Sequence, residues 1–189
     1  MDDQSTEEKV KQYKESAEQG DAVAQCELGL FYLLGVGISK SETDAVFWFR
    51  KAAEQGNATA QCNLGSCYAI GAGVPMDTTE AANLYRLAAE QGHANAQYCL
   101  ASMYARGDGV SQDPAEALHW YHKSAEQGMA EAQFELGLYY FLKAANQGHA
   151  LAAHNLNLLQ KNWSKKWMIP WIIVAVAAGI VGFVLGHIM

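Results

Sequence analysis

Small and large apolar residues recur along the chain with the spacing of amphipathic helices arranged in pairs. The first helix of a pair carries Leu-Gly-x-x-Tyr or a close variant, so that Leu28 and Tyr32, four residues apart, share one helical face. The second helix carries an alanine and then adjacent large residues, as in Ala45, Trp48 and Phe49. Both patterns return every 36 residues. A fixed period of this length predicts an all-α solenoid of helix-turn-helix repeats with the aromatic side chains in its core.

The motif Ala-Glu-Gln-Gly closes each hairpin. Its glycines, Gly20, Gly56, Gly92 and Gly128, lie 36 residues apart and fit left-handed helix C-caps. We therefore expect one soluble domain, residues 1–160. Its parts are a capping helix at 6–19, repeats at 21–56, 57–92 and 93–128, a shortened repeat at 129–148 and a final helix at 149–160.

Local signals agree with this division. Paired glycines, as in Gly71-Ala-Gly73, predict turns with positive φ between the two helices of a repeat. Each second helix starts at Ser41, Asp77 or Asp113 with an acid three residues later, which is a capping-box pattern. One glutamine position is invariant between repeats, which predicts a hydrogen bond between helices rather than a role in selecting a ligand. It is Gln25, Gln61, Gln97 and Gln133.

The fourth repeat departs from the period. Only 20 residues separate Gly128 from Gly148, so the interhelical loop and its flanking helix ends are missing. No helix-breaking residue lies between Ala130 and Asn146, which predicts one continuous helix of about 25 Å. Tyr140 then stands both at the first-helix Tyr position and at the second-helix Trp position.

The C-terminal sequence predicts a transmembrane tail anchor at 167–189, preceded by a basic linker at 161–166. Residues 167–186 are 20 uncharged residues, enough to cross a bilayer. The three linker lysines favour a cytoplasmic N-terminal domain. We expect a bacterial inner membrane, with the endoplasmic reticulum as the alternative. Ala178, Gly182 and Gly186 form a small-residue face that permits homodimerisation, although such residues are also common in membrane spans.

Charge and cysteine usage narrow the function further. Residues 1–160 carry 10 basic and 20 acidic side chains, a balance that repels nucleic acid. The cysteines, Cys26, Cys62, Cys67 and Cys99, lack the CxxC spacing of a zinc site. We interpret them as buried reduced thiols.

Candidate chemistry is sparse. His119 and His122 lie three apart on one helix, but a metal ion would need ligands from a second helix, and we interpret both as solvated side chains. His93 and His149 follow repeat glycines and are interpreted as helix-start residues. The paired-glycine loops lack the strand, third glycine and lysine of a phosphate loop. We therefore expect no catalytic residues, metal or cofactor.

The full pattern, A-x-x-A-Q-x-x-L-G-x-x-Y-x-x-G-x-G-V-x-x-D-x-x-E-A-x-x-W-x-x-x-A-A-E-Q-G, resembles the Sel-1-like repeat, a relative of the tetratricopeptide repeat. The resemblance covers residues 6–160 and implies a right-handed α-solenoid. It also implies a scaffold or adaptor that holds a protein or peptide in its concave groove. A cysteine-rich branch of the family with β-lactam binding suggests the alternative, an enzyme or β-lactam-binding protein. Ala53 occupies the site of the first cysteine expected for that branch, so its disulfides do not carry over.

Positions that vary between repeats on the first helices predict where a partner binds. The expected partner-binding groove comprises Glu27, Leu30, Asn63, Ser66, Ser102, Arg106, Glu131 and Glu135. The same stripe includes Val23, Leu34, Thr59, Ile70, Asn95, Cys99 and Leu138.

Overall fold

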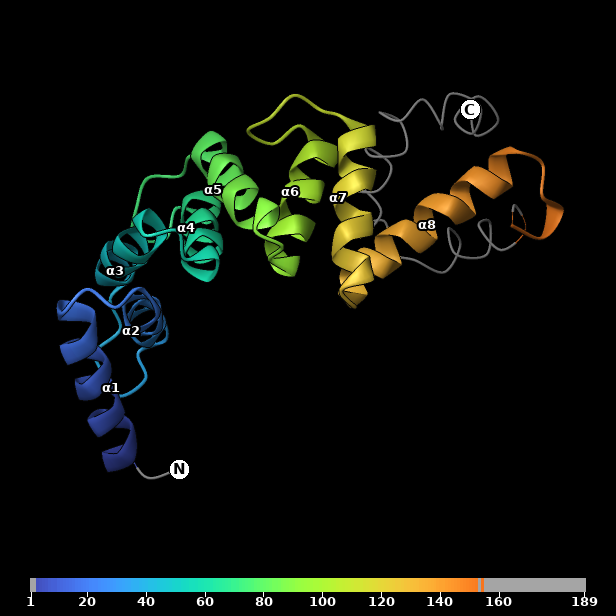
Figure 1. Cartoon of the computed structure of the whole chain (residues 1–189). Helices are drawn as coiled ribbons and strands as arrows, with labels where there is room; N and C mark the ends of the chain where they lie inside the picture. The colour runs from blue at the N-terminus through green and yellow to red at the C-terminus, as the bar shows by residue number, and fades with distance from the viewer. Residues whose placement is uncertain (1–2, 153, 155–189) are drawn as a thin grey trace.

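The computed structural model describes residues 3–152 and 154, and this part of the chain is helical (Figure 1). Its helices are α1 (Asp3–Glu18), α2 (Ala22–Leu34), α3 (Glu42–Glu54), α4 (Ala58–Ile70), α5 (Thr78–Glu90), α6 (Ala94–Arg106), α7 (Pro114–Glu126) and α8 (Ala130–Asn146). Each helix packs chiefly against the helices before and after it in the chain. Such nearest-neighbour packing confirms the predicted helical-repeat solenoid.

The helices form a curved array (Figure 1). The first helices of the repeats, α2, α4 and α6, lie towards the inner side of the arc, and α3 and α5 lie towards its outer side. Helix α1 packs against α2 at the N-terminal end, where Val10 and Ala17 are buried. The helices that carry the varied positions therefore lie on the inner side of the arc.

The core is built from the predicted aromatic and small residues. Phe49 is fully buried, and its ring lies where a Cβ on Gly29 would otherwise sit, 2.6 Å from that position. Tyr85 covers Gly65 in the next repeat in the same way. Aromatic rings that occupy the space above a glycine backbone bring the two helices of a hairpin close together. The prediction that the aromatic stripe forms the core is confirmed.

Turn glycines hold neighbouring repeats in contact. Gly35, Gly71 and Gly107 end the first helices in the left-handed conformation, as predicted. The second loop glycine has a further role, because a Cβ on Gly109 would collide with the backbone carbonyl of Thr78 in the preceding repeat. A residue other than glycine would therefore push apart the loop and the start of α5.

The helix starts differ in one detail from the capping-box prediction. The Asp113 carboxylate accepts the backbone amides of Ala115 and Glu116, as expected for an N-cap. However, the Asp113 amide donates to the Tyr104 carbonyl at 3.0 Å rather than to Glu116. Glu116 instead accepts the indole N–H of Trp120 at 3.2 Å. The second hydrogen bond of a capping box, from the N-cap amide to the acid three residues later, is thus replaced by a bond that joins the two helices of a hairpin.

The invariant glutamines form hydrogen bonds between helices, as predicted. The Gln97 amide nitrogen donates to the Ala89 carbonyl at 3.1 Å, and its oxygen accepts from Gln127 at 2.7 Å. Gln25 and Gln61 make the equivalent pairs with the glutamines of the next two closing motifs. Each buried glutamine therefore links the end of one repeat to the end of the next.

The structure confirms that the shortened repeat contains one continuous helix, α8. Tyr140 adopts the first-helix role, because its hydroxyl bonds to His122 at 2.9 Å as Tyr104 bonds to Arg86. No helix within residues 3–152 and 154 is long and apolar enough to cross a membrane. The basic linker, the predicted span at 167–189 and most of the final helix at 149–160 lie outside the described residues.

We expect Gln97→Ala to lower the free energy of unfolding by about 1–3 kcal/mol, because two hydrogen bonds at a buried position are lost. Gln133→Ala is the matched control, since exposed Gln133 makes the same donor bond to the Ala125 carbonyl. Gln133→Ala should lower the free energy of unfolding by less than about 1 kcal/mol. Urea unfolding followed by circular dichroism measures both, and equal losses would contradict the structural role of the buried bond.

Candidate functional site

The varied positions on the first helices are half-buried in the middle of each helix and exposed at its ends, and we call the surface that they form the trough. We call this set of positions on α2, α4, α6 and α8 the inner stripe. Its middle positions are half-buried in all four helices, and they are Glu27, Leu30, Asn63, Ser66, Cys99, Ser102, Glu135 and Leu138. Its end positions are exposed, and they are Val23, Leu34, Thr59, Ile70, Asn95, Arg106 and Glu131. A surface that is covered along its centre and open along both edges can receive an elongated segment of another molecule.

Side chains along the middle of the inner stripe contact the neighbouring helices. The Asn63 side-chain amide approaches the Cys26 sulfur at 3.9 Å, which connects α4 to α2. The Ser66 hydroxyl bonds to the Tyr85 hydroxyl at 3.0 Å and donates to the Cys62 carbonyl. These side chains already have partners within the chain, so they form the floor of the trough and support its shape.

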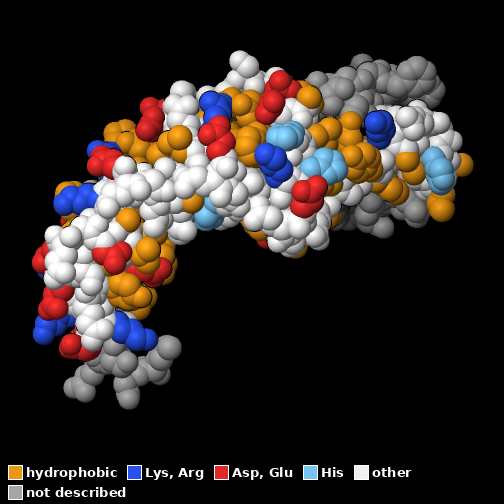
Figure 2. All heavy atoms as spheres, viewed as in Figure 1, with side chains coloured by type: hydrophobic (Ala, Val, Ile, Leu, Met, Phe, Trp, Pro, Cys, Tyr) orange, Lys and Arg blue, Asp and Glu red, His pale blue; other side chains and the backbone are white. Residues whose placement is uncertain are grey.

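One end of the trough is apolar. Val23, Leu34 and Ile70 expose 61%, 67% and 76% of their surface at the two edges of α2 and α4. Figure 2 shows hydrophobic side chains on the inner side of the arc near α2. Exposed aliphatic side chains gathered on one surface mark places where an apolar partner is favourable.

The other end is polar and carries an unusual carboxyl group. Burial raises the pKa of Glu135 to about 7, and the positive charge of Arg106 opposes this shift. Tyr98 and Tyr121 lie close enough for the Glu135 charge to raise the pKa of both phenols, after burial as the main cause. Arg106 also forms an ion pair with Asp108 at 3.1 Å. Glu135 therefore changes its charge close to neutral pH.

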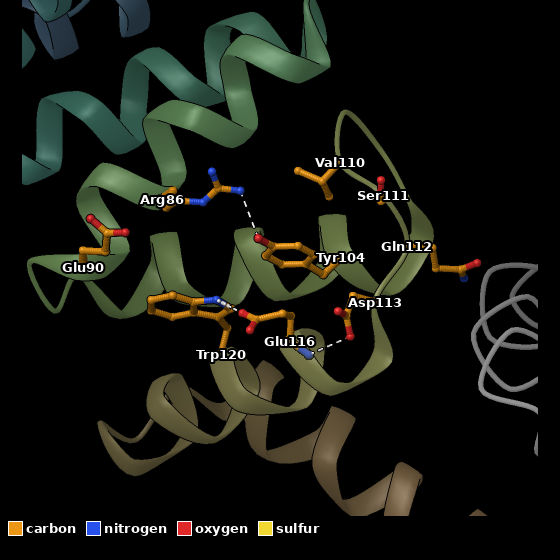
Figure 3. Close-up of a pocket in the computed structure, with 9 residues that line it drawn as sticks. All are labelled: Arg86, Glu90, Tyr104, Val110, Ser111, Gln112, Asp113, Glu116 and Trp120. Atoms are coloured by element: carbon orange, nitrogen blue, oxygen red, sulfur yellow. Dashed lines mark hydrogen bonds between the residues drawn. The ribbon is translucent and has the colours of Figure 1, made fainter.

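A second hollow lies on another surface, between α5, α6 and the loop before α7 (Figure 3). It is an open cleft of about 570 Å³ whose lining includes Arg86, Tyr104 and Trp120. Arg86 donates to the Tyr104 hydroxyl at 2.9 Å. Three carboxylates, Glu90, Asp113 and Glu116, line the same cleft. This excess of negative charge disfavours the binding of a phosphate group at the glycine-containing loop before α7.

The remaining histidines and cysteines have structural contacts. His93 accepts the Ala96 amide at 3.3 Å and is the N-cap of α6, as predicted. His122 is half-buried against Tyr140, so its interpretation as a solvated side chain is wrong, while His119 stacks edge-on against Trp120. No group of three or more His, Cys, Asp or Glu within residues 3–152 and 154 could hold a metal ion.

All four cysteines are free thiols. Cys26, Cys62 and Cys67 are buried, as predicted, whereas Cys99 is half-buried. Burial raises the pKa of Cys62 to about 12 and that of Cys26 to about 11. Such thiols remain protonated at neutral pH and are poor nucleophiles.

Comparison with known proteins agrees with this architecture. The family model described as Sel1 repeat matches residues 22–57, 58–93, 94–129 and 130–149. The chain belongs to the Sel1 repeat family. Its fourth match is short, which agrees with the continuous helix α8 in that Sel1 repeat.

Several solved structures of Sel1 repeat proteins are similar. A Sel1 repeat protein from Oxalobacter formigenes shares 40% identity over 68% of this chain and 97% of that chain, with a TM-score of 0.63. The protective antigen c5321 of uropathogenic Escherichia coli shares 31% identity over 94% of this chain and 43% of that chain, with a TM-score of 0.68. Cysteine-rich protein B of Helicobacter pylori shares 25% identity over 65% and 93%, with a TM-score of 0.53. A comparison with curated proteins finds no match.

Two features of these Sel1 repeats escaped the sequence analysis. The Arg–Tyr bond across the cleft recurs as Arg50 with Tyr68, and the basic residue precedes the tyrosine by 18 residues each time. That regular spacing could have revealed the Arg–Tyr bond from the sequence. The burial of Glu135 had no comparable signal, because it depends on how α8 lies against α6 and α7.

We expect Glu135→Gln to change the pH dependence of stability. The folded-state pKa of about 7 lies above the ordinary value of 4.5, so the folded protein favours the protonated form and loses stability as pH rises between these values. Above pH 7, the variant should therefore unfold at a higher temperature than the parent chain, and below pH 4.5 the two should coincide. Thermal unfolding across this range measures the effect. Glu131→Gln, at an exposed position on the same helix, is the control.

Proposed function

We propose that the chain is a protein-interaction scaffold whose inner stripe holds a segment of a partner protein. The observation that carries this proposal is the trough, with a half-buried middle and exposed edges, repeated over four helices. Membership of the Sel1 repeat family supports such a role, because stacked helical hairpins provide an extended surface for binding.

The chemistry of the inner stripe indicates the kind of partner. Aliphatic side chains at Val23, Leu34 and Ile70 suit apolar residues at one end of the bound segment. Arg106 and Glu131 at the other end suit polar or charged residues. A segment that is apolar at one end and charged at the other would therefore bind in one direction, because reversal would bury charges against aliphatic side chains.

The scaffold is further proposed to act at a membrane. The support is the uncharged run at 167–186 together with Lys161, Lys165 and Lys166 before it. This arrangement would place the repeats on the cytoplasmic side of a bacterial inner membrane, or of the endoplasmic reticulum in a eukaryote. Anchoring would raise the concentration of a bound partner at that surface. The small-residue face of Ala178, Gly182 and Gly186 would permit the spans to pair.

An enzymatic or β-lactam-binding function is not favoured. The cysteine-rich protein B of Helicobacter pylori is similar in fold, but the four cysteines of this chain are free thiols. No feature of the trough or of the cleft favours a hydrolytic reaction over protein binding.

We expect the double variant Glu27→Lys with Arg106→Glu to lose at least tenfold in partner capture, because each change reverses a charge on the inner stripe. The readout is quantitative mass spectrometry of proteins cross-linked to the tagged chain in its native cell. The matched control, Glu54→Lys with Lys123→Glu, reverses one charge of each sign at exposed positions of α3 and α7. If both double variants retain every captured protein, the inner stripe does not bind the partner.

We expect Val174→Arg with Val181→Arg to release the chain from membranes, because each arginine at the centre of a span costs about 2.5–3.5 kcal/mol. Flotation of the full chain with lipid vesicles, before and after alkaline extraction, measures the change. Val174→Leu with Val181→Leu should remain with the lipid. A parent chain that stays out of the lipid fraction would disprove the anchor and leave the protein-binding proposal standing.

A further inference from the structure

The C-terminal end of the trough contains a carboxyl group that no hydrogen bond stabilises within residues 3–152 and 154. Glu135 is half-buried on α8, and no donor in this part of the chain bonds to it. At the same repeat position, the Asn63 amide and the Cys99 thiol each contact a neighbouring side chain at 3.9 Å. A half-buried charge without a partner is unfavourable, and the raised pKa of Glu135 is the result.

The positive charge that faces Glu135 is already paired. Arg106 of α6 lowers the pKa of Glu135, but by less than burial raises it. The Arg106 Nε atom instead lies 3.1 Å from Asp108 Oδ2. Glu131, one turn before Glu135 on α8, is exposed and forms no ion pair with the described residues. Since Arg106 and Asp108 offset each other, the two carboxylates of α8 make this end of the trough negatively charged.

An aromatic surface lies beside these carboxylates. Tyr98 of α6 and Tyr121 of α7 pack with their ring centroids 5.8 Å apart. After burial, the charge of Glu135 is the largest cause of the raised pKa of both phenols, and Glu131 also raises that of Tyr98. Tyr121 is buried, whereas Tyr98 is half-buried and keeps part of its surface accessible. Cys62 holds the position of Tyr98 in the preceding repeat, so this ring belongs to the C-terminal end of the trough.

These groups match the two parts of a basic side chain. Lysine and arginine carry an apolar stem and a charged head. A tyrosine ring attracts a cation and packs against the stem, while carboxylates form charge-assisted hydrogen bonds with the head. An acidic side chain would be repelled here. An apolar side chain would cover Glu135 without giving its charge a partner.

We propose that the C-terminal end of the trough binds one lysine or arginine side chain of the partner. Glu135 and Glu131 pair with its charge, and Tyr98 packs against its stem. The inference rests on the proposed scaffold function and names the residue that the partner supplies at this end. Together with the exposed aliphatic side chains of α2 and α4, it defines a partner segment that is apolar at one end and basic at the other.

Binding of such a cation depends on pH through Glu135. Its carboxyl has a pKa of about 7 in the free protein, and a cation stabilises the ionised form. The affinity is therefore highest above pH 7 and falls about tenfold from pH 8 to pH 6, because the carboxyl takes up a proton that binding must displace. Of the other described groups that face Glu135, Arg106 stays charged, and Tyr98 and Tyr121, whose pKa values burial raises, stay neutral over this range. The exposed carboxylate of Glu131 completes this set.

Peptide pools test the proposal on the full chain in detergent micelles. Peptides of about ten residues span four helices, since an extended chain advances about 3.3 Å per residue and packed helices lie about 8–10 Å apart. Each fluorescent pool fixes lysine, Nε-acetyl-lysine or glutamate at one position and varies the others. At one fixed position or more, fluorescence anisotropy at pH 8 should show that lysine binds at least fivefold more tightly than acetyl-lysine, which keeps the stem and lacks the charge.

Two variants assign this preference to Glu135. Glu135→Gln should bind the lysine and acetyl-lysine pools equally and lose the pH dependence. It should remain folded by circular dichroism, because the neutral amide replaces a half-buried charge. Glu54→Gln, at an exposed position of α3, removes the same charge outside the trough. It should keep both the lysine preference and the pH dependence.

Equal binding of the lysine and acetyl-lysine pools at every position would overturn the inference and leave the scaffold function standing. An affinity that rises as pH falls, and loses this dependence in Glu135→Gln, would also overturn it, since a protonated carboxyl would then donate to the partner. Binding by no pool would contradict both the inference and the scaffold function. A lysine preference that appears only after Lys161, Lys165 and Lys166 are changed to glutamine would overturn the inference too, because the chain's own linker would then occupy the site.

Discussion

The close contact between an aromatic ring and a backbone without a side chain is the interaction on which the rest of this solenoid depends. Phe49 over Gly29 and Tyr85 over Gly65 bring the two helices of a hairpin near each other, and the alanines around them leave room for this approach. Because the two helices of each hairpin lie close together, the next hairpin can stack against both of them. The half-buried middle of the inner stripe follows from this stacking, since Asn63 and Ser66 reach side chains of adjacent helices.

Stacking alone would allow hairpins to slide, and polar contacts between repeats oppose this. Each buried glutamine joins three points, namely its own helix, the end of the preceding helix and the end of the next repeat, as Gln97 does. The second loop glycine adds a steric limit, because Gly109 lies directly on the backbone of the preceding repeat at Thr78. Directional bonds and a close backbone contact together fix the angle between repeats, and this angle determines the curvature of the trough.

The sequence predicted the features that recur with the repeat period or depend on the local chemistry of one residue. The helices, their caps at Asp77 and Asp113, the buried aromatics and the glutamine bonds all follow from the period and from local chemistry. It did not predict the polar contacts set by how the two helices of one hairpin lie against each other. Ser66 was chosen only as a varied position, and its bond to Tyr85 shows that a varied position can still be structural. The expected reciprocal capping box at Asp113 was half right for the same reason, because the Tyr104 carbonyl of the neighbouring helix competes for the amide.

Helix α8, at the C-terminal end of the array, shows what changes when a repeat is shortened. The invariant Gln133 still donates to the Ala125 carbonyl, yet it is exposed, because no closing motif follows at the regular distance. Gly137 keeps its place, but no ring from residues 3–152 or 154 lies above it. Glu135, by contrast, keeps the half-buried position that Asn63 and Cys99 have in the full repeats, and its carboxyl lies near Arg106 and the tyrosines of α6 and α7. The interruption thus separates Gln133 and Gly137 from the contacts that a full repeat provides among the described residues, whereas Glu135 keeps the half-buried position that stacking against α6 and α7 gives it.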